Sequence, residues 1–285
     1  MFIKQKLYNL QSRFLYSIYP KIIDKYLQYA NYFAIRKLKQ AKAKTILVDS
    51  TIIHNAITHR TGWVSTGGQM WGEESIDSGR LSRIPIDKKF QQKDWGSIKY
   101  LPSIAYLEKN NILILCDSDE LKDEQECHPS NRFRPTGWMD YSLFQDVKFK
   151  TIKDITYPVV INSWQNINHK NERKNRLEKN QKNNSLYQSL VEILGVKNSQ
   201  DAWHITVAND NNCYCFLTMD YSLIRSIESQ KGHIAIKSLK TKVMTPETFA
   251  KTFSLAQLHY KHLSYHDASF FVEPNLSISK SIKKR

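Results

Sequence analysis

Short apolar runs alternate with helix-like stretches between residues 45 and 236, and this order constrains the fold more than any other feature. The runs are Thr45–Val48, Ile112–Cys116, Cys213–Leu217 and His233–Ile236, and each is short enough to be a buried strand. Strands that alternate with helices predict an α/β fold with a mostly parallel central sheet and helices on both faces, a Rossmann-like three-layer arrangement. No internal repeat is visible.

Helical periodicity and capping residues give the expected helices. We expect them at Thr51–His59, Leu101–Asn110, after a Ser118 cap, at Leu186–Leu194 before Gly195, at Asp201–Ala208 after a Ser199 cap, and at Ser222–Glu228. Residues 60–98 and 127–150 show no clear period, and residues 162–184 read as a solvated helix or a loosely ordered segment. We therefore predict a domain at 45–260 with insertions at about 60–98 and 127–184.

Basic extensions flank this domain. Residues 3–41 have apolar residues at three- and four-residue spacing, and Pro20 is placed to start a second helix. A packed helical hairpin or a basic nucleic-acid arm fits residues 1–44 better than a membrane-surface helix, because no lipidation signal is present. Residues 261–285 form a basic tail.

The net charge of +15 sits largely in three segments. Residues 1–44 carry ten basic residues against Asp24 alone, a net +9, while residues 165–182 and the last six residues carry +4 each. The remainder is therefore slightly acidic, at −2. Basic extensions on such a body suit a polyanionic partner, and an AT-rich genome that favours lysine codons is the competing explanation.

The cysteines and the hydropathy suggest a compartment. The four cysteines form no C-x-x-C pair, and the alternation of Cys213 and Cys215 indicates small buried residues. The chain has no apolar run of about 18 residues and no cleavable signal segment at its N-terminus. We expect a reduced, cytoplasmic protein without stable membrane insertion.

Carboxylates follow two of the predicted strands. Asp49 ends the first, Asp220 lies just past the strand at 213–217, and Asp201 opens a helix. Acids at the carboxyl ends of parallel strands are where open α/β sheets build their sites, and converging carboxylates commonly hold a divalent cation. The structural alternatives are a favourable first-turn position for Asp201 and a turn-starting role for Asp220.

These segments resemble a known family. The run V-D-S-T-I-I-H-N-A-I from Val48 resembles the first strand and helix of a PIN domain, and D-A-W-H-I-T-V-A-N-D-N-N-C-Y-C-F-L-T-M-D from Asp201 resembles its helix–strand–acid segment. T-P-E-T-F at 245–249 resembles the closing turn into a terminal helix, and C-D-S-D-E-L-K-D-E-Q-E at 116–126 falls where the middle acid belongs. The resemblance covers about half of residues 45–250, in the family's order.

The resemblance implies a ribonuclease that uses Mg²⁺ or Mn²⁺ and leaves a 5′-phosphate and a 3′-hydroxyl. Carried over by position, the catalytic and metal-binding acids are Asp49, Glu124, Asp201 and Asp220, and Thr218 is the supporting hydroxyl. Ser50, beside Asp49, and Glu120, one turn before Glu124, are further supporting candidates. Asp117, Asp119, Asp123 and Glu126 compete with Glu124 for the middle position. Clustered acids repel one another unless a cation neutralises them, and such a cation activates water for attack on a phosphodiester.

Several functions stay open. The nuclease is either toxin-like, controlled by an antitoxin or another regulatory protein, or a stand-alone enzyme, with RNA as the expected partner. The alternatives are a structure-specific DNA nuclease and a catalytically silent PIN-like module that binds RNA or protein. Zinc-hydrolase, Walker and nucleophile-elbow motifs are missing. His54 and His204 are expected to be packing or surface residues, and Trp63, Trp71, Trp95 and Trp138 either stack bases or form a small core of their own. No feature indicates an oligomeric state.

Overall fold

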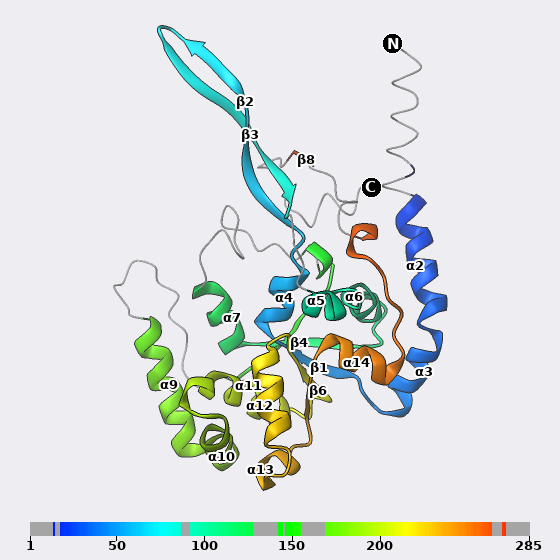
Figure 1. Cartoon of the computed structure of the whole chain (residues 1–285), viewed down its shortest axis with the longest axis vertical. Coiled ribbons are helices and arrows are strands. Elements are labelled where there is room, and N and C mark those ends of the chain that lie inside the picture. The colour runs from blue at the N-terminus through cyan, green and yellow to red at the C-terminus, as the bar shows by residue number, and fades with distance from the viewer. Residues whose placement is uncertain are drawn as a thin grey trace.

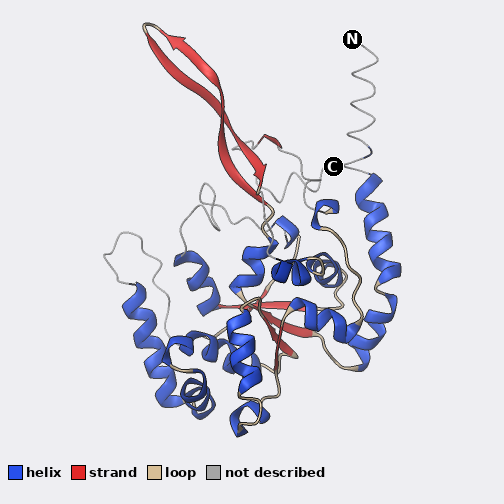
Figure 2. Cartoon of the chain, in the orientation of Figure 1, coloured by secondary structure: helices blue, strands red, loops and turns tan. Residues whose placement is uncertain are grey.

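A five-stranded, all-parallel sheet lies at the centre of the computed structural model, which describes residue 14 and residues 18–86, 92–127, 142–144, 146–154, 169–263 and 270–271 (Figures 1 and 2). The spatial order is β5-β4-β1-β6-β7, so the first strand along the chain is the central one. Its members are β1 Thr45–Val48, β4 Ile114–Ser118, β5 Lys150–Ile152, β6 Cys215–Leu217 and β7 Lys242–Met244. The predicted α/β class with a parallel central sheet is confirmed.

Side chains of the central strand alternate between two hydrophobic cores. Ile46 and Val48 join a cluster on one face of the sheet, and Leu47 joins a second cluster on the other. All three side chains have no exposed surface. Because both faces of β1 are apolar, the strand needs a helical layer on each side, and the result is a three-layer arrangement.

Helices cover both faces, as the alternation of patterns predicts. Those whose apolar residues join the first cluster are α3 Tyr32–Gln40, α4 Ser50–Ala56, α5 Gln92–Ile98, α6 Leu101–Lys109 and α14 Pro246–Phe253. Those that contribute to the second are α7 Asp119–Cys127, α9 His169–Asn183, α10 Ser185–Leu194, α11 Ser199–Asp210, α12 Tyr221–Ser229 and α13 Ile234–Lys237. Short 3₁₀ turns lie at η3 Ser142–Phe144, η4 Val196–Asn198 and η5 Tyr260–His262. No helix in the described ranges is both long and apolar enough to cross a bilayer.

The N-terminal helix α2, Tyr19–Ala30, is fixed to this body. Pro20 stands in its first turn, as expected, and Ile23 and Leu27 pack against Leu258. Asn31 then separates α2 from α3, and its buried side chain donates to Ser103 Oγ at 3.2 Å and accepts from the Ala256 amide at 2.9 Å. The expected earlier helix lies largely outside the described residues and stays a prediction.

The stretch 60–98 was expected to be irregular, and that expectation is wrong. β2 His59–Trp71 and β3 Glu74–Pro85 form a long antiparallel hairpin, which projects from the body in Figure 1, and α5 follows. Glycines interrupt the alternation of apolar and polar residues in these strands, and two of them have defined roles in the hairpin. Gly72 turns the chain at φ +67°, and a Cβ on Gly79 would lie 2.5 Å from the Trp63 ring, which packs over it. Part of the tail, β8 Phe270–Phe271, pairs with β3.

The predicted strand at His233–Ile236 is also wrong. His233 accepts a hydrogen bond from the Ala235 amide and caps the one-turn helix α13, and the strand beside β6 is β7. A four-residue apolar run has no period long enough to separate a strand from a helical turn. Smaller shifts occur elsewhere: the helix after β1 ends at Ala56, and Ser199 is the first residue of α11 rather than its cap. Ser118 does accept from the Leu121 amide, at 3.3 Å.

Candidate active site

The parallel pairing of β1 and β6 brings their carboxyl ends side by side, and the first acid follows directly. Asp49 comes after β1, and its amide donates to the Leu217 carbonyl, at the end of β6, at 2.9 Å. Thr218 and Asp220 continue from β6 at the same edge. The helices α4 and α12 begin at Ser50 and Tyr221, so each strand passes into a helix at this point. This edge is where a parallel α/β sheet normally carries its site.

Hydroxyl groups hold Asp49 in place. Its side chain is 4% exposed, and its Oδ2 atom accepts from Thr51 Oγ1 at 2.5 Å and from Thr218 Oγ1 at 2.6 Å. Burial raises the pKa of Asp49 above its usual value, the two hydroxyls oppose that rise, and the nearby Glu124 adds to it. Asp49 is therefore a buried carboxylate whose negative charge is only partly stabilised by its hydrogen bonds.

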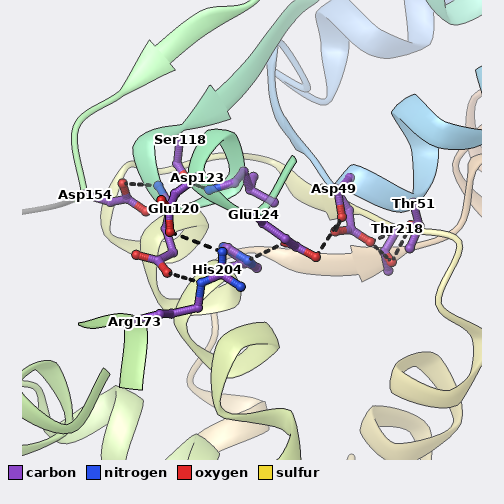
Figure 3. A network of polar contacts seen from close by, with 12 residues as sticks. Asp49, Thr51, Ser118, Glu120, Asp123, Glu124, Asp154, Arg173, His204 and Thr218 are labelled. Carbon is purple, nitrogen blue, oxygen red and sulfur yellow. Dashed lines mark hydrogen bonds and ion pairs between the residues drawn. The ribbon is translucent and has the colours of Figure 1, made fainter. Parts of the chain in front are cut away.

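Glu124 reaches the same place from α7 and lies between Asp49 and His204 (Figure 3). Ser50 Oγ donates to Glu124 Oε1 at 3.2 Å and also approaches Asp49 Oδ1 at 3.4 Å, so this hydroxyl links the two acids. On the other side, His204 Nε2 lies 3.7 Å from Glu124 Oε2. Burial opposes the ionisation of Glu124, but His204 and Ser50 outweigh it and hold its pKa below the usual value.

His204 is a buried residue at the centre of the acids. It is 1% exposed, and neither ring nitrogen has a hydrogen-bond partner within bonding distance among the described residues. Burial disfavours its charge, yet Glu124, Asp49 and Asp201 together raise the pKa of its imidazole. His204 is thus buried, as expected of a packing histidine, and its ring centroid lies 5.9 Å from that of Phe216, but the expectation did not include its position beside the acids. The missed signal is its spacing: His204 follows Asp201 by three residues, which puts both on one face of α11.

Asp201 belongs to the same group of acids and comes from α11. It stands half-buried in the first turn of α11, and burial together with repulsion from Asp49, Asp220 and Glu124 raises its pKa to about 7, although His204 opposes the change. Those influences show that the four predicted acids share one electrostatic neighbourhood. Asp220 has a structural task as well, because its Oδ1 caps α12 by accepting from the Ser222 amide at 2.7 Å and the Leu223 amide at 3.0 Å.

The acids of α7 divide between two environments. Glu120, which is 2% exposed, and Asp123 face the arginines of α9: Arg176 Nε lies 3.2 Å from Glu120 Oε2, and Arg176 Nη2 lies 2.7 Å from Asp123 Oδ2. Arg173 adds contacts of 3.2 Å to Glu120 and 3.1 Å to Asp123. Glu120 is thus neutralised within an ion-pair network, whereas Glu124 faces Asp49. This separation favours Glu124 as the middle acid.

The donor chemistry of the cluster suits a hard cation, although its present arrangement is not a finished metal site. Carboxylate and hydroxyl oxygens are the ligands that Mg²⁺ and Mn²⁺ prefer. In the described part of the chain, no three His, Cys, Asp or Glu side chains are already arranged to hold a metal ion. The case for a Mg²⁺ or Mn²⁺ ion here therefore depends on the oxygen ligands that the cluster offers and on the crowding of acids that raises the pKa of Asp201.

The remaining candidates have separate places. Trp95 packs against the first core, and its ring centroid lies 4.8 Å from that of His259 in a tilted arrangement, whereas Trp63 and Trp71 are exposed on the hairpin. Trp138 lies outside the described residues. Cys116, Cys213 and Cys215 are buried and free, as expected of small apolar residues.

Comparison of the chain with protein-family models, with curated proteins and with solved structures finds no match. The class that the structure defines is thus a three-layer α/β protein with clustered acids at the carboxyl edge of its parallel sheet.

Proposed function

We propose that this chain is a metal-dependent endoribonuclease of the PIN-like type, which hydrolyses RNA phosphodiester bonds at the acid cluster. The observation that carries the proposal is the convergence of Asp49, Glu124 and Asp201 around the buried His204, at the carboxyl edge of the sheet. Ionised acids that lie close together at such an edge repel one another and raise the free energy of the protein, and a bound divalent cation offsets that repulsion.

Asp49, Glu124, Asp201 and Asp220 are the residues that would hold Mg²⁺ or Mn²⁺, and the bound ion would polarise the phosphoryl oxygen and lower the pKa of the attacking water. The protein's own groups then have distinct tasks. Thr51 and Thr218 orient Asp49, and His204 keeps Glu124 ionised. In the metal-free protein, burial and repulsion from the other acids raise the pKa of Asp201 to about 7, and a bound cation would relieve that repulsion and favour the ionised carboxylate as a ligand.

The distribution of charge supports a nucleic-acid substrate. The protein has a net charge of +15, concentrated outside a slightly acidic body, and phosphate backbones bind such surfaces with little regard to sequence. We extend the proposal to a protein regulator, such as an antitoxin, that restrains the nuclease. Cytoplasmic location remains part of the same proposal.

The proposal is tested by removing charge from the acids. Asp49→Asn and Asp201→Asn are each expected to lower Mn²⁺-dependent cleavage of single-stranded RNA by about 100-fold or more, because each removes a carboxylate from the shared site. Asp210→Asn is the matched control, since Asp210 is an exposed acid at the other end of the same helix. For Asp220, asparagine is preferable to alanine because it can still cap α12. Cleavage that is unchanged in both Asp49→Asn and Asp201→Asn rules out the carboxylate mechanism.

A second candidate function is a catalytically silent module that binds RNA or protein. The contact of His204 with Glu124 favours it, because this imidazole already supplies part of the positive charge that the acids require. Wild-type protein that shifts RNA in a gel with a steep salt dependence and cleaves neither RNA nor DNA would establish this function. Cleavage of branched or flapped DNA, with single-stranded RNA left intact, would instead identify a structure-specific DNA nuclease.

A further inference from the structure

The N-terminal helices expose a continuous apolar stripe on the side away from the body. Ile22, Tyr26, Tyr29 and Phe33 recur at three- and four-residue spacing, and Tyr29 and Phe33 are 74% and 67% exposed. The opposite side of the same helices is buried through Ile23, Leu27, Ala34 and Leu38. These helices therefore have two apolar sides, only one of which is covered within the chain. Exposed stripes of this length mark an interaction surface.

A second exposed apolar surface lies at the tip of the β2–β3 hairpin. Met70 and Trp71 are 69% and 80% exposed, and Ile76 lies on the returning strand, 48% exposed. The hairpin extends well clear of the body in Figure 1. The thirteen residues of β2 and the twelve of β3 correspond to a reach on the order of 40 Å. An arm of this kind is suited to reach another molecule.

The charges beside the two surfaces are opposite. Along the helical stripe the exposed Lys21, Lys25 and Arg36 outnumber the exposed Asp24, while Glu73 and Glu74 are exposed at the hairpin turn. Two stripes placed face to face would bring like charges together, and so would two hairpin tips. A stripe and a tip, by contrast, match in both apolar character and charge.

We propose that the hairpin tip of one copy docks on the α2–α3 stripe of a second copy. If the second copy's tip docks on the first copy's stripe in the same way, a two-fold axis relates the two contacts and the assembly closes as a dimer. This pairing buries Trp71 and Ile76, which lie on the same face of the hairpin, against Tyr26, Tyr29 and Phe33. It accounts for both exposed surfaces with one partner, whereas an anionic membrane would account for the basic stripe and repel the acidic tip. The inference is independent of the nuclease proposal.

The test is the mass of the full chain in solution, together with charge reversal. Light scattering after gel filtration, at micromolar concentration, is expected to give twice the 33.4 kDa of one chain. The tip variant Glu73→Lys/Glu74→Lys and the stripe variant Lys21→Glu/Lys25→Glu are each expected to weaken dimerisation by roughly tenfold or more, because each now opposes like charges. All four positions are exposed, and unchanged thermal unfolding of each variant confirms that it still folds.

The decisive measurement mixes the two variants in equal amounts. Each contact in the mixed pair then joins opposite charges again, so a dimer containing one copy of each variant should form more tightly than the dimer of either variant alone. A monomeric wild type, or variants that dimerise as well as the wild type, would overturn the proposal. So would stripe-dependent binding to vesicles of equal parts phosphatidylglycerol and phosphatidylcholine that the tip variant retains in full, since that result assigns the stripe to a lipid surface.

Discussion

At the scale of single residues, Asp201 links the candidate site to the stability of the protein. Its pKa is raised from 3.8 to about 7, so the folded state holds a proton that the unfolded state releases at lower pH. Stability is therefore lost as pH rises from about 4 to about 7 and is level above that range. The loss from this one group is on the order of 4 kcal/mol, because each pKa unit corresponds to about 1.4 kcal/mol.

The loss of stability with rising pH predicts how Asp201→Asn should behave in metal-free protein. Because asparagine resembles the protonated acid, the variant should unfold at a higher temperature than the wild type near neutral pH, and the difference should shrink towards about pH 4. Thermal unfolding in EDTA at several pH values measures it. Mg²⁺ should then stabilise the wild type near pH 8 and leave the variant nearly unchanged, because ligand binding stabilises only the form that binds. A variant that is less stable than the wild type at every pH contradicts the crowding of acids.

The sequence predicts some residues of the acid cluster better than others. Asp49 is recognisable because a buried apolar strand ends abruptly on an acid, and the structure places it where that pattern predicts. The assignment of Glu124 rather than Glu120 as the middle acid depends on α9, because the arginines of α9 form ion pairs with Glu120. Those arginines lie more than fifty residues away along the chain, so no local spacing reveals the pairing. The raised pKa of His204 likewise follows from the acids that surround it in space.

At the scale of elements, a network of ion pairs between α7 and α9 joins the buried Glu120 and Asp123 to Arg173 and Arg176. Arg176→Met leaves Glu120 and Asp123, which are 2% and 6% exposed, with Arg173 as their remaining partner in this network. The variant should lose about 3 kcal/mol of unfolding free energy, the lower end of the usual range for a broken buried pair, because Arg173 persists. Urea denaturation provides the measurement.

The same helix offers a control for that variant. Lys174 forms an exposed contact of 3.8 Å with Glu178 one turn along, and Lys174→Met should change stability by no more than about 0.5 kcal/mol. Adding Asp123→Asn to Arg176→Met should restore part of the loss, since it removes one of the two buried carboxylates that then share Arg173 alone. Equal effects of the Arg176 and Lys174 substitutions would mean that the network does not hold α9 in place.

Elements with a clear period are predictable here, and elements defined by partners far away in the chain are not. The central strand and the helices α6, α10 and α12 lie within a few residues of their predicted positions because their own apolar spacing specifies them. The hairpin was missed because its glycines obscure the alternation. Its two-residue turn after Trp71, with glycine first, is nevertheless a local signal for a hairpin.

At the scale of the whole molecule, the structure reduces the basic surface available to a polyanion. Within residues 165–182, Arg173 and Arg176 neutralise acids of α7, which leaves four lysines against two glutamates. If the α2–α3 stripe is covered in a dimer, part of the N-terminal charge is also occupied. The basic C-terminal residues then carry a larger share of any contact with RNA.

If the basic C-terminal residues carry much of the contact with RNA, their removal should change how RNA affinity depends on salt. Replacing the four basic residues of the tail by glutamine should reduce the slope of log K against log[salt] by as much as about 3, because each single-strand phosphate contact contributes about 0.7. The residues are Lys280, Lys283, Lys284 and Arg285. Fluorescence anisotropy with a labelled single-stranded RNA measures the slope, and the Asp49→Asn background with EDTA prevents cleavage.

A matched set of four lysines separates local contact from total charge. Lys109, Lys122, Lys174 and Lys251 each lie within 3.8 Å of a carboxylate of the body. Converting these four to glutamine removes the same net charge but should change the slope far less, since their charge is already neutralised in place. Equal slopes for the two sets would show that RNA responds to the net charge of the whole protein rather than to its tail.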